Sequence, residues 1–170
     1  MVLGRLHWFA LQVYRRLPVQ ARRRVVRAIA PAYTVGSICV IERSDGALLL
    51  VRLSYRNNWG LPGGLLKRSE TPADAARREV MEESGLAVDL VGDPAVVVDE
   101  VAQRVDVVFG AQPAAGADTT AVHTSSPEIV EVAWFAPDEL PDLQFEASGA
   151  LVALARRAVT PSVAERGEVR

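Results

Sequence analysis

The sequence predicts an α/β fold with an N-terminal helical extension, and three observations support that prediction. Apolar residues recur at helical spacing from Met1 to Pro31, apolar runs typical of strands begin after Tyr33, and one helix between the strands has clear start and stop signals. At 170 residues, 49% of them hydrophobic, the chain is long enough for one domain with a substantial core. We expect residues 1–31 to form the extension, 32–157 the main domain and 158–170 a flexible tail.

The extension should contain two helices. In the first, the apolar positions recur three or four residues apart: Leu6, Phe9, Ala10, Val13 and Leu17. Pro18 ends this helix, and a second one, "VQARRRVVRAIA", should run to Pro31. Residues 1–31 also contain seven arginines and no acidic side chain. This basic amphipathic segment is suited to a peripheral membrane contact or a homodimer contact, and packing against the main domain is the alternative.

The rest of the chain is acidic. Because the whole chain carries −2 and residues 1–31 carry +7, the remainder carries −9, which argues against an extended nucleic-acid surface. No apolar run is long enough to cross a bilayer, and Arg5 and His7 interrupt a start that otherwise resembles a signal peptide. Cys39 is the only cysteine. We therefore expect a cytoplasmic protein whose one thiol is buried and inert.

Five runs typical of strands follow the extension. "TVGSICVIE" and "ALLLVRLS" flank "RSDG", a turn signature that predicts a hairpin. "AVVVDE", "RVDVVFGA" and "EIVEVAWFA" come later, and the second of these alternates in hydrophobicity with the period of a strand. A long loop rich in small residues, "QPAAGADTTAVHTSSP", separates the last two strands, and "EASGALVALARRAV" should form a closing helix.

The helix between the two groups of strands has the clearest boundaries. Thr71 supplies a hydroxyl cap, Pro72 occupies the first helical position, and Asp74 stands where a reciprocal cap would lie. Gly85 is a strong stop signal. Ahead of the helix, the segment "WGLPGGLLKRSE" is expected to be a glycine-rich loop that can expose backbone groups to a ligand.

Three glutamates gather on one side of this helix. At about 100° per residue, Glu79, Glu82 and Glu83 fall within roughly a quarter of its circumference. Like charges at this spacing repel and weaken a helix by a few tenths of a kcal/mol. A bound cation would turn the repulsion into attraction, and hard oxygen ligands suit Mg²⁺ or Mn²⁺. A solvated acidic helix face is the alternative.

The spacing of these residues resembles a known family signature. Gly64 is followed after five residues by Glu70, and after seven more by "REVMEESGL", which runs from Arg78 to Leu86. On this complete box the chain is identified as a member of the Nudix (MutT-like) hydrolase family. The lead-in "LPGG" and the segment "EVAWFAPDELP" extend the resemblance over about residues 33–157.

The resemblance implies a mixed β-sheet sandwiched between α-helices. It also implies a Mg²⁺-dependent (or Mn²⁺-dependent) pyrophosphohydrolase that uses a metal-activated water to cleave a phosphoanhydride bond in a nucleoside diphosphate linked to another group. By position it implies metal ligands, one of them able to act as base, and two residues that orient the carboxylates. The ligands would be Gly63 through its carbonyl, Glu79, Glu82 and Glu83; the orienting residues would be Arg78 and Glu70.

The family often takes a further carboxylate from the loop before the last strand. Glu128 is our first choice for that metal ligand, and Glu131 is the rival. Arg52 and Arg56 precede the box and are candidates for binding substrate phosphate, with plain surface exposure equally open.

Three further side chains invite a functional interpretation, but a structural one is preferred. His123 could contact substrate, although a solvated loop histidine is the better interpretation. Trp59 and Trp134 could stack on a nucleobase, although core packing is preferred for each.

A non-catalytic nucleotide-binding or regulatory domain is the alternative function. Loss of a box carboxylate would favour it, and none is lost. The substrate stays open, because Ala102 and Gln103 stand where relatives specific for ADP-ribose or dinucleoside polyphosphates carry proline or tyrosine. A nucleoside triphosphate, a nucleotide sugar or another diphosphate conjugate remains consistent with the sequence.

Overall fold

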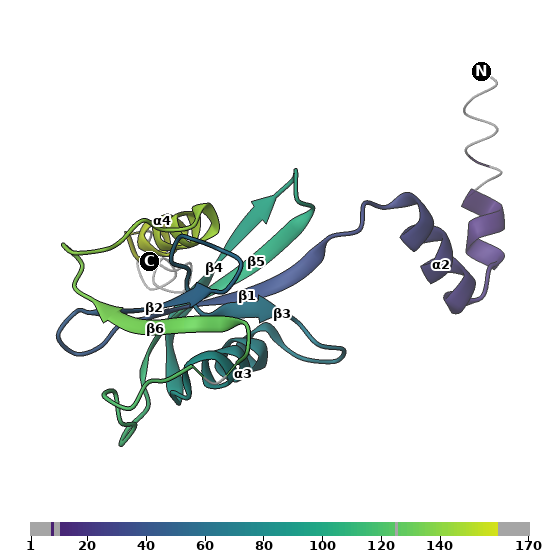
Figure 1. Cartoon of the computed structure of the whole chain (residues 1–170). Coiled ribbons are helices and arrows are strands. Elements are labelled where there is room, and N and C mark those ends of the chain that lie inside the picture. The colour runs from purple at the N-terminus through teal and green to yellow at the C-terminus, as the bar shows by residue number, and fades with distance from the viewer. Residues whose placement is uncertain (1–7, 9–10, 125, 160–170) are drawn as a thin grey trace, which may run out of the picture. The chain divides into compact units, whose positions relative to one another are not determined.

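The structure is a computed structural model that describes residue 8 and residues 11–124 and 126–159 (Figure 1). The chain divides into two compact units, Met1–Tyr33 and Thr34–Arg170. The expected helix positions Leu6, Phe9 and Ala10 and the expected tail beyond residue 159 lie outside the described residues.

The described part of the first unit is helical. Residues 11–16 form a helix, Pro18 interrupts it, and helix α2 spans Val19–Ile29. The Nε of Arg22 donates a hydrogen bond to the carbonyl of Leu17 at 2.8 Å. This bond ties the first turn of α2 to the end of the preceding helix.

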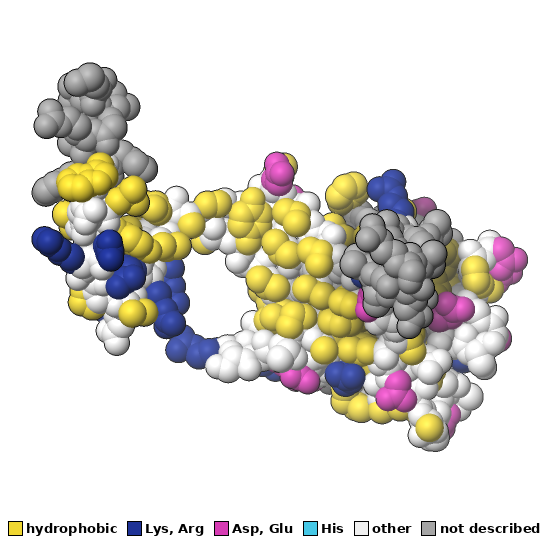
Figure 2. Space-filling view, turned by 180° about the vertical axis from the view of Figure 1, so that it is seen from behind, with side chains coloured by type: hydrophobic (Ala, Val, Ile, Leu, Met, Phe, Trp, Pro, Cys, Tyr) yellow, Lys and Arg dark blue, Asp and Glu magenta, His cyan; other side chains and the backbone are white. Residues whose placement is uncertain are grey.

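The surface of α2 is amphipathic and open. The helix buries none of its residues, and its apolar side chains Val19 and Ile29 are 58% and 78% exposed. Hydrophobic and basic side chains lie next to one another on this unit (Figure 2). Among the described residues, no helix combines the length and the apolar character that crossing a bilayer requires.

The second unit contains a mixed four-stranded sheet and a two-stranded sheet (Figure 1). The larger has the strand order β3-β1-β5-β4, in which β1 and β5 are parallel and the other pairs antiparallel. Its strands are β1 (Thr34–Ile41), β3 (Gly63–Leu65), β4 (Val88–Asp99) and β5 (Arg104–Pro113). The smaller sheet pairs β2 (Leu48–Leu53) with β6 (Ile129–Phe135) in antiparallel fashion.

Helices cover the mixed sheet on its two sides. Helix α3 (Pro72–Ser84) packs against β1 and β3, and helix α4 (Phe145–Val159) packs against β4 and β5 (Figure 1). The implied arrangement, a mixed sheet sandwiched between helices, is thus confirmed. Residues 158 and 159, which we expected in the tail, belong to α4.

The predicted hairpin between the first two strands is wrong. The turn exists, because Gly46 donates its N–H to the carbonyl of Arg43, but the flanking strands share only an isolated bridge from Glu42 to Leu48. Strand β1 is hydrogen-bonded on one edge to β3 and on the other to β5, so it has no edge left for β2. β2 pairs with β6 instead.

Two other boundaries differ from expectation. Residues 63–65, expected as loop, form strand β3, because Gly63 and Gly64 lie close enough to β1 to pair with it. Strand β4 is longer than "AVVVDE" and starts at Val88. Its register with β5 shifts between Val91 and Ala95, and this interruption lets one strand continue past Pro94.

The core consists of one apolar layer on each side of the mixed sheet. Alternate residues of β1 supply both layers, since successive side chains of a strand point to opposite faces. Cys39 and Ile41 pack with Val80 of α3, and Ile38 and Val40 pack with residues of β5 and α4. Cys39 is fully buried, and burial raises the pKa of its thiol to about 12, which confirms the expectation of an inert thiol.

Candidate active site

The local sequence of α3 explains where its glutamates face. The Thr71 hydroxyl accepts a hydrogen bond from the N–H of Asp74, and Gly85 ends the helix with a φ of 69°, a conformation that favours glycine. The reciprocal cap takes another form, because the Thr71 hydroxyl also donates to the Asp74 carboxylate at 2.6 Å. The helix buries Ala75, Ala76, Val80 and Ser84. The glutamates lie beside this buried face and are themselves partly covered, since the side chain of Glu79 is 15% exposed.

Arg78 holds three of the box carboxylates together. Its Nε and Nη2 donate to the two oxygens of Glu70 at 2.6 and 2.9 Å. Its Nη1 donates to Glu79 at 2.6 Å and to Glu82 at 3.1 Å. Nη2 also reaches the carbonyl of Leu65 in β3 at 3.3 Å. The guanidinium therefore fixes the positions of these carboxylates relative to β3.

The same contacts shift the pKa values in opposite directions. The hydrogen bond from Arg78, followed by the one from the Lys67 backbone N–H, lowers the pKa of Glu70 to about 2. Hydrogen bonding to Glu70 raises the pKa of Arg78 above its ordinary value. Lys67, whose Nζ lies 3.2 Å from Glu82, lowers the pKa of that carboxyl. Glu70 and Glu82 are thus held in the charged form.

Glu83 differs from its neighbours. Its Oε2 accepts a hydrogen bond from the backbone N–H of Gly63 at 3.1 Å. Burial, and after it the nearby charges of Glu79, Glu128 and Glu82, raise the pKa of Glu83 to about 8 against the effect of that hydrogen bond. Four carboxylates therefore lie close enough to interact electrostatically.

Two glycines of β3 allow the box carboxylates to approach the sheet. A Cβ on Gly63 would collide with the backbone carbonyl of Ser37 in β1, and a Cβ on Gly64 would collide with the Glu79 carboxylate. A larger residue in place of Gly63 would push β3 away from β1, and one in place of Gly64 would displace the Glu79 carboxylate. Close packing against the β1 backbone thus requires Gly63, whereas Gly64 leaves room for the end of the Glu79 side chain.

The glutamates face a cavity of about 570 Å³ between β3, α3 and the start of α4. Its charged lining consists of Arg56, Arg104, Glu79, Glu82, Glu83, Glu128 and Glu146. Of the rival carboxylates before the last strand, Glu128 lines this cavity. Glu131 is not among the lining residues and pairs with Arg52 at 2.6 Å.

Of the two arginine candidates for phosphate binding, likewise only one lines the cavity. Arg56 lines the cavity and lies 3.5 Å from Glu146, whereas Arg52 is not in the lining. The guanidinium of Arg52 lies 5.9 Å from the ring centroid of Trp59, which in turn packs edge-on against Phe135. Arg52 is thereby held outside the cavity.

His123 and Trp134 lie away from the cavity. The His123 backbone N–H donates to the carbonyl of Ser84, and its exposed ring lies beside Gly85 at the end of α3. Trp134 packs against the core layer beneath α3, and its Nε1 donates to the carbonyl of Thr119 at 2.9 Å.

Sequence reasoning missed several lining residues, among them Tyr55, Arg104 and Gln144. Tyr55 and Gln144 come from irregular segments that carry no motif. Arg104 gave a usable signal, because it stands two residues before Asp106 in a strand, so the two opposite charges share one face.

The donor set of the cavity fits a divalent cation by type. Its carboxylate oxygens are the hard ligands that Mg²⁺ and Mn²⁺ prefer, and burial together with neighbouring carboxylates raises the pKa of Glu83. Within the described ranges, no three acidic, histidine or cysteine side chains converge as a ready ion cage, because Glu79 and Glu82 turn toward Arg78. Metal binding therefore requires these two side chains to reorient.

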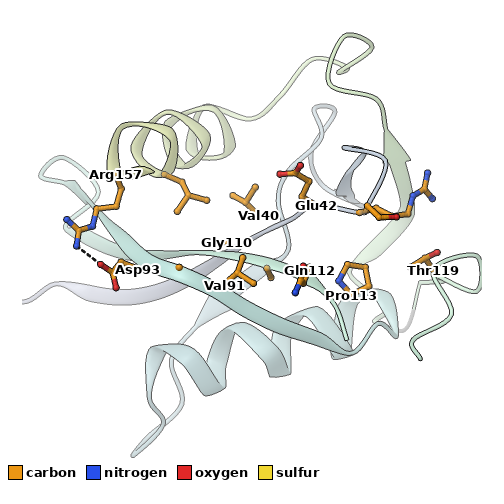
Figure 3. Close-up of a pocket in the computed structure, with 14 residues that line it drawn as sticks. Val40, Glu42, Val91, Asp93, Gly110, Gln112, Pro113, Thr119 and Arg157 are labelled. Carbon is orange, nitrogen blue, oxygen red and sulfur yellow. Dashed lines mark hydrogen bonds and ion pairs between the residues drawn. The ribbon is translucent and has the colours of Figure 1, made fainter. Parts of the chain in front are cut away.

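A second and larger cavity, of about 820 Å³, lies toward the other end of α4 (Figure 3). Its lining includes Val40 and Glu42 at the end of β1, Gly110 of β5 and Arg157 of α4. Arg157 forms an ion pair with Asp93 at 2.9 Å across its rim (Figure 3). None of the box glutamates lines this cavity.

Comparison with known proteins gives a consistent result. A family model described as NUDIX domain matches residues 32–155. The chain is 34% identical over 116 residues to a MutT-like protein of Streptomyces ambofaciens, and the match covers 68% of this chain and 72% of that protein. The structure is similar to the crystal structure of a NUDIX hydrolase from Nitrosomonas europaea, with a TM-score of 0.63, 24% identity and coverage of 76% and 75% of the two chains.

Shorter matches to curated proteins cover too little of either chain to indicate a substrate. A segment of 56 residues is 39% identical to an RNA pyrophosphohydrolase of Xanthomonas campestris pv. campestris, but it covers 31% of this chain and 27% of that protein. Function depends on the site and not on the fold alone, so such a match leaves the substrate open.

Proposed function

The chain belongs to the NUDIX family of pyrophosphohydrolases, and from that premise we propose a specific reaction and site. The proposed reaction is Mg²⁺-dependent hydrolysis of a phosphoanhydride bond in a nucleoside diphosphate linked to another group. The proposed metal ligands are Glu79, Glu82 and Glu83, with Glu128 from the loop before β6 and the carbonyl of Gly63. We place the reaction in the cytoplasm.

One observation carries this proposal: Glu79, Glu82, Glu83 and Glu128 line one cavity, where burial and then the charges of the other three raise the pKa of Glu83. Such an arrangement is costly unless a cation binds there. Mg²⁺ held by these carboxylates would neutralise diphosphate charge and would make water a usable nucleophile near neutral pH.

The residues of the chain supply position and proton transfer. Arg78 and Glu70 hold Glu79 and Glu82 at the cavity edge through hydrogen bonds of 2.6 to 3.1 Å. Gly63 fixes Glu83 through its N–H. One of the three glutamates accepts the proton of the attacking water. The cavity walls orient the diphosphate between these carboxylates and the two lining arginines.

The test is a phosphate-release screen over a nucleotide library with Mg²⁺ and Mn²⁺, using wild type beside Glu79→Gln and Glu83→Gln. We expect each variant to lose at least about 10²-fold in rate, because metal or base function is removed. Glu42→Gln is the matched control, since Glu42 lines the second cavity. Variants as active as wild type overturn the site, and nucleotide binding without any turnover supports the non-catalytic alternative.

We also propose that the first unit docks on a membrane surface rich in anionic lipid. Residues 1–31 carry seven arginines and no acid, and α2 presents exposed Val19 and Ile29 on a helix that also holds Arg23, Arg24 and Arg27. Anionic headgroups complement the arginines, and the apolar side enters the headgroup boundary.

Vesicle binding tests this contact. We expect the full chain to sediment with vesicles containing phosphatidylglycerol and not with phosphatidylcholine alone. The triple variant Arg23→Gln, Arg24→Gln, Arg27→Gln should lose this binding. Deleting residues 1–31 should abolish it with unchanged melting of the remainder. Loss of a dimer on deletion supports the homodimer contact, and aggregation of the truncated chain supports packing against the main unit.

A further inference from the structure

Arg104 is a second arginine of the box cavity, and it is held more firmly than Arg56. It is the first residue of β5, and its Nε lies 2.8 Å from both carboxylate oxygens of Asp106. The side chain of Asp106 is 9% exposed and that of Arg104 is 33% exposed. A nearly buried carboxylate thus anchors a guanidinium whose outer part reaches the cavity.

The anchoring leaves the outer part of the guanidinium available. Nε is the donor that faces Asp106, and in the described part of the chain the Nη1 and Nη2 groups of Arg104 make no hydrogen bond. These terminal groups form the fork that binds two oxygens of a phosphate at once. By contrast, Arg78 uses Nε, Nη1 and Nη2 in bonds to protein atoms.

Gly36 directs this fork toward the box. In the parallel ladder Gly36 of β1 is the partner of Asp106, and on its other edge it pairs with Leu65 of β3. A Cβ on Gly36 would collide with the Asp106 carboxylate and lie 2.8 Å from Nη2 of Arg104. The missing Cβ therefore lets the guanidinium lie over β1, between its own strand and the strand that carries Gly64.

The charge of the cavity indicates which lining arginine can bind a phosphate group. Its lining has five glutamates and two arginines, and Arg56 already lies 3.5 Å from Glu146. A diphosphate entering such an acidic cavity needs guanidinium N–H donors that protein groups have not taken. The Nη1 and Nη2 groups of Arg104 meet this need, because Asp106 accepts from Nε alone.

We propose that Arg104 binds a phosphate group of the substrate, and that Asp106 and Gly36 act as positioning residues that hold its fork over β1. This assignment rests on the proposed function of the cavity. It identifies the diphosphate, and not the nucleobase, as the part of the substrate recognised from the β5 side.

The experiment compares Arg104→Ala and Arg104→Lys with wild type in three measurements. These are KM and kcat for the nucleotide found in the screen, the Kd for inorganic pyrophosphate with Mg²⁺ by calorimetry, and thermal unfolding. We expect Arg104→Ala to raise KM and the pyrophosphate Kd by about 10-fold or more, with a much smaller change in kcat. Arg104→Lys should recover part of the affinity, because it keeps the charge and loses the fork.

Arg43→Ala is the matched control. Arg43 also pairs with an aspartate two residues later, Asp45, and its side chain is 29% exposed, but it lies outside the box cavity. We expect its KM and pyrophosphate Kd to match wild type. If Arg104→Ala does not fold, Arg104→Lys still decides, since a positive partner for Asp106 remains.

The outcomes distinguish the role of Arg104 from the proposed function of the cavity. Wild-type hydrolysis together with an unchanged KM and Kd in the Arg104 variants overturns the role of Arg104 and leaves the proposed function standing. A wild-type protein that hydrolyses no nucleotide and binds no pyrophosphate overturns both. A raised KM with an unchanged kcat and unchanged melting supports phosphate binding over a structural role.

Discussion

The two cavities described above lie on the same face of the mixed sheet, but the charges of their lining residues differ. Strand β1 contributes Ile38 to the smaller cavity and Val40 to the larger, and α4 contributes Ala147 and Leu154 in the same order. The larger measures about 820 Å³ and the smaller about 570 Å³. A choice of active site by volume alone would therefore select the cavity that contains none of the box glutamates.

Charge balance separates the cavities. In the larger one Arg43 pairs with Asp45 and Arg157 pairs with Asp93, so each arginine is matched by a nearby acid. In the smaller one Glu83 and Glu128 have no ion pair among the described residues, and burial followed by nearby carboxylates strongly raises the pKa of Glu83. Carboxylates without a cationic partner are thus a better guide to chemistry here than cavity volume.

The largest effect should come from replacing a glycine of the smaller cavity, and a glycine of the larger cavity provides the comparison. Gly64→Ala should lower kcat by about 10²-fold, because the new Cβ displaces the Glu79 carboxylate and small misplacements of reacting groups cost that much. In Gly110→Ala the nearest atom is the Val91 carbonyl oxygen at 3.3 Å, so activity should persist. Steady-state kinetics and melting of both variants check this, and equal losses would remove the distinction between the cavities.

The next effect concerns which of the two carboxylates near the start of β6 belongs to the metal site. Glu128→Gln should raise the Mn²⁺ concentration needed for half-maximal activity by about 10-fold, the scale for groups that support a metal site. Glu131→Gln should leave it close to wild type, because Glu131 pairs with Arg52 outside the cavity. Metal titrations of the two variants decide the point, and the reverse order would move the border to Glu131.

A smaller effect is expected on stability. Arg78→Ala should lower the free energy of unfolding by about 1–3 kcal/mol, because it leaves partly buried Glu79 without its hydrogen-bond donor and Glu70 with only the Lys67 N–H. Urea denaturation with an unchanged m-value measures the change. A variant as stable as wild type would show that the network serves the metal site alone.

The smallest effect should be at the rim of the larger cavity. The side chains of Arg157 and Asp93 are 39% and 60% exposed, so Arg157→Ala should change the free energy of unfolding by about 0.5 kcal/mol or less. The same urea experiment checks this, and hydrolysis should be unaffected. A loss of activity here would give the larger cavity a part in the reaction.

The sequence predicted the features that local rules determine. Helix α3 begins after Thr71 and ends at Gly85 because capping and the left-handed conformation depend on a few neighbouring residues. Strand β5 followed from alternation, and the burial of Cys39 from its apolar surroundings. The grouping of the box residues also followed, because their spacing places them on one side of one helix.

The features missed by the sequence depend on residues far apart in the chain. The turn around Gly46 is local, but the pairing of β1 depends on β3 and β5, which come later in the chain. The hairpin prediction failed for that reason. Likewise, nothing near Arg52 shows that Glu131 and Trp59 hold it outside the cavity. The place of Arg104 depends on Gly36, which is distant in the chain but lies on the neighbouring strand of the parallel ladder.

Strand β4 pairs with β5 alone among the described strands, so one of its long edges is open. Val96 and Val98 are exposed on it, a composition that invites another chain to add a strand and begin fibre growth. Pro94 has no N–H to donate, and the register shift between Val91 and Ala95 bends the strand at the same point. A proline in the middle of this edge thus removes one donor from any intermolecular ladder and limits such a ladder to shorter stretches.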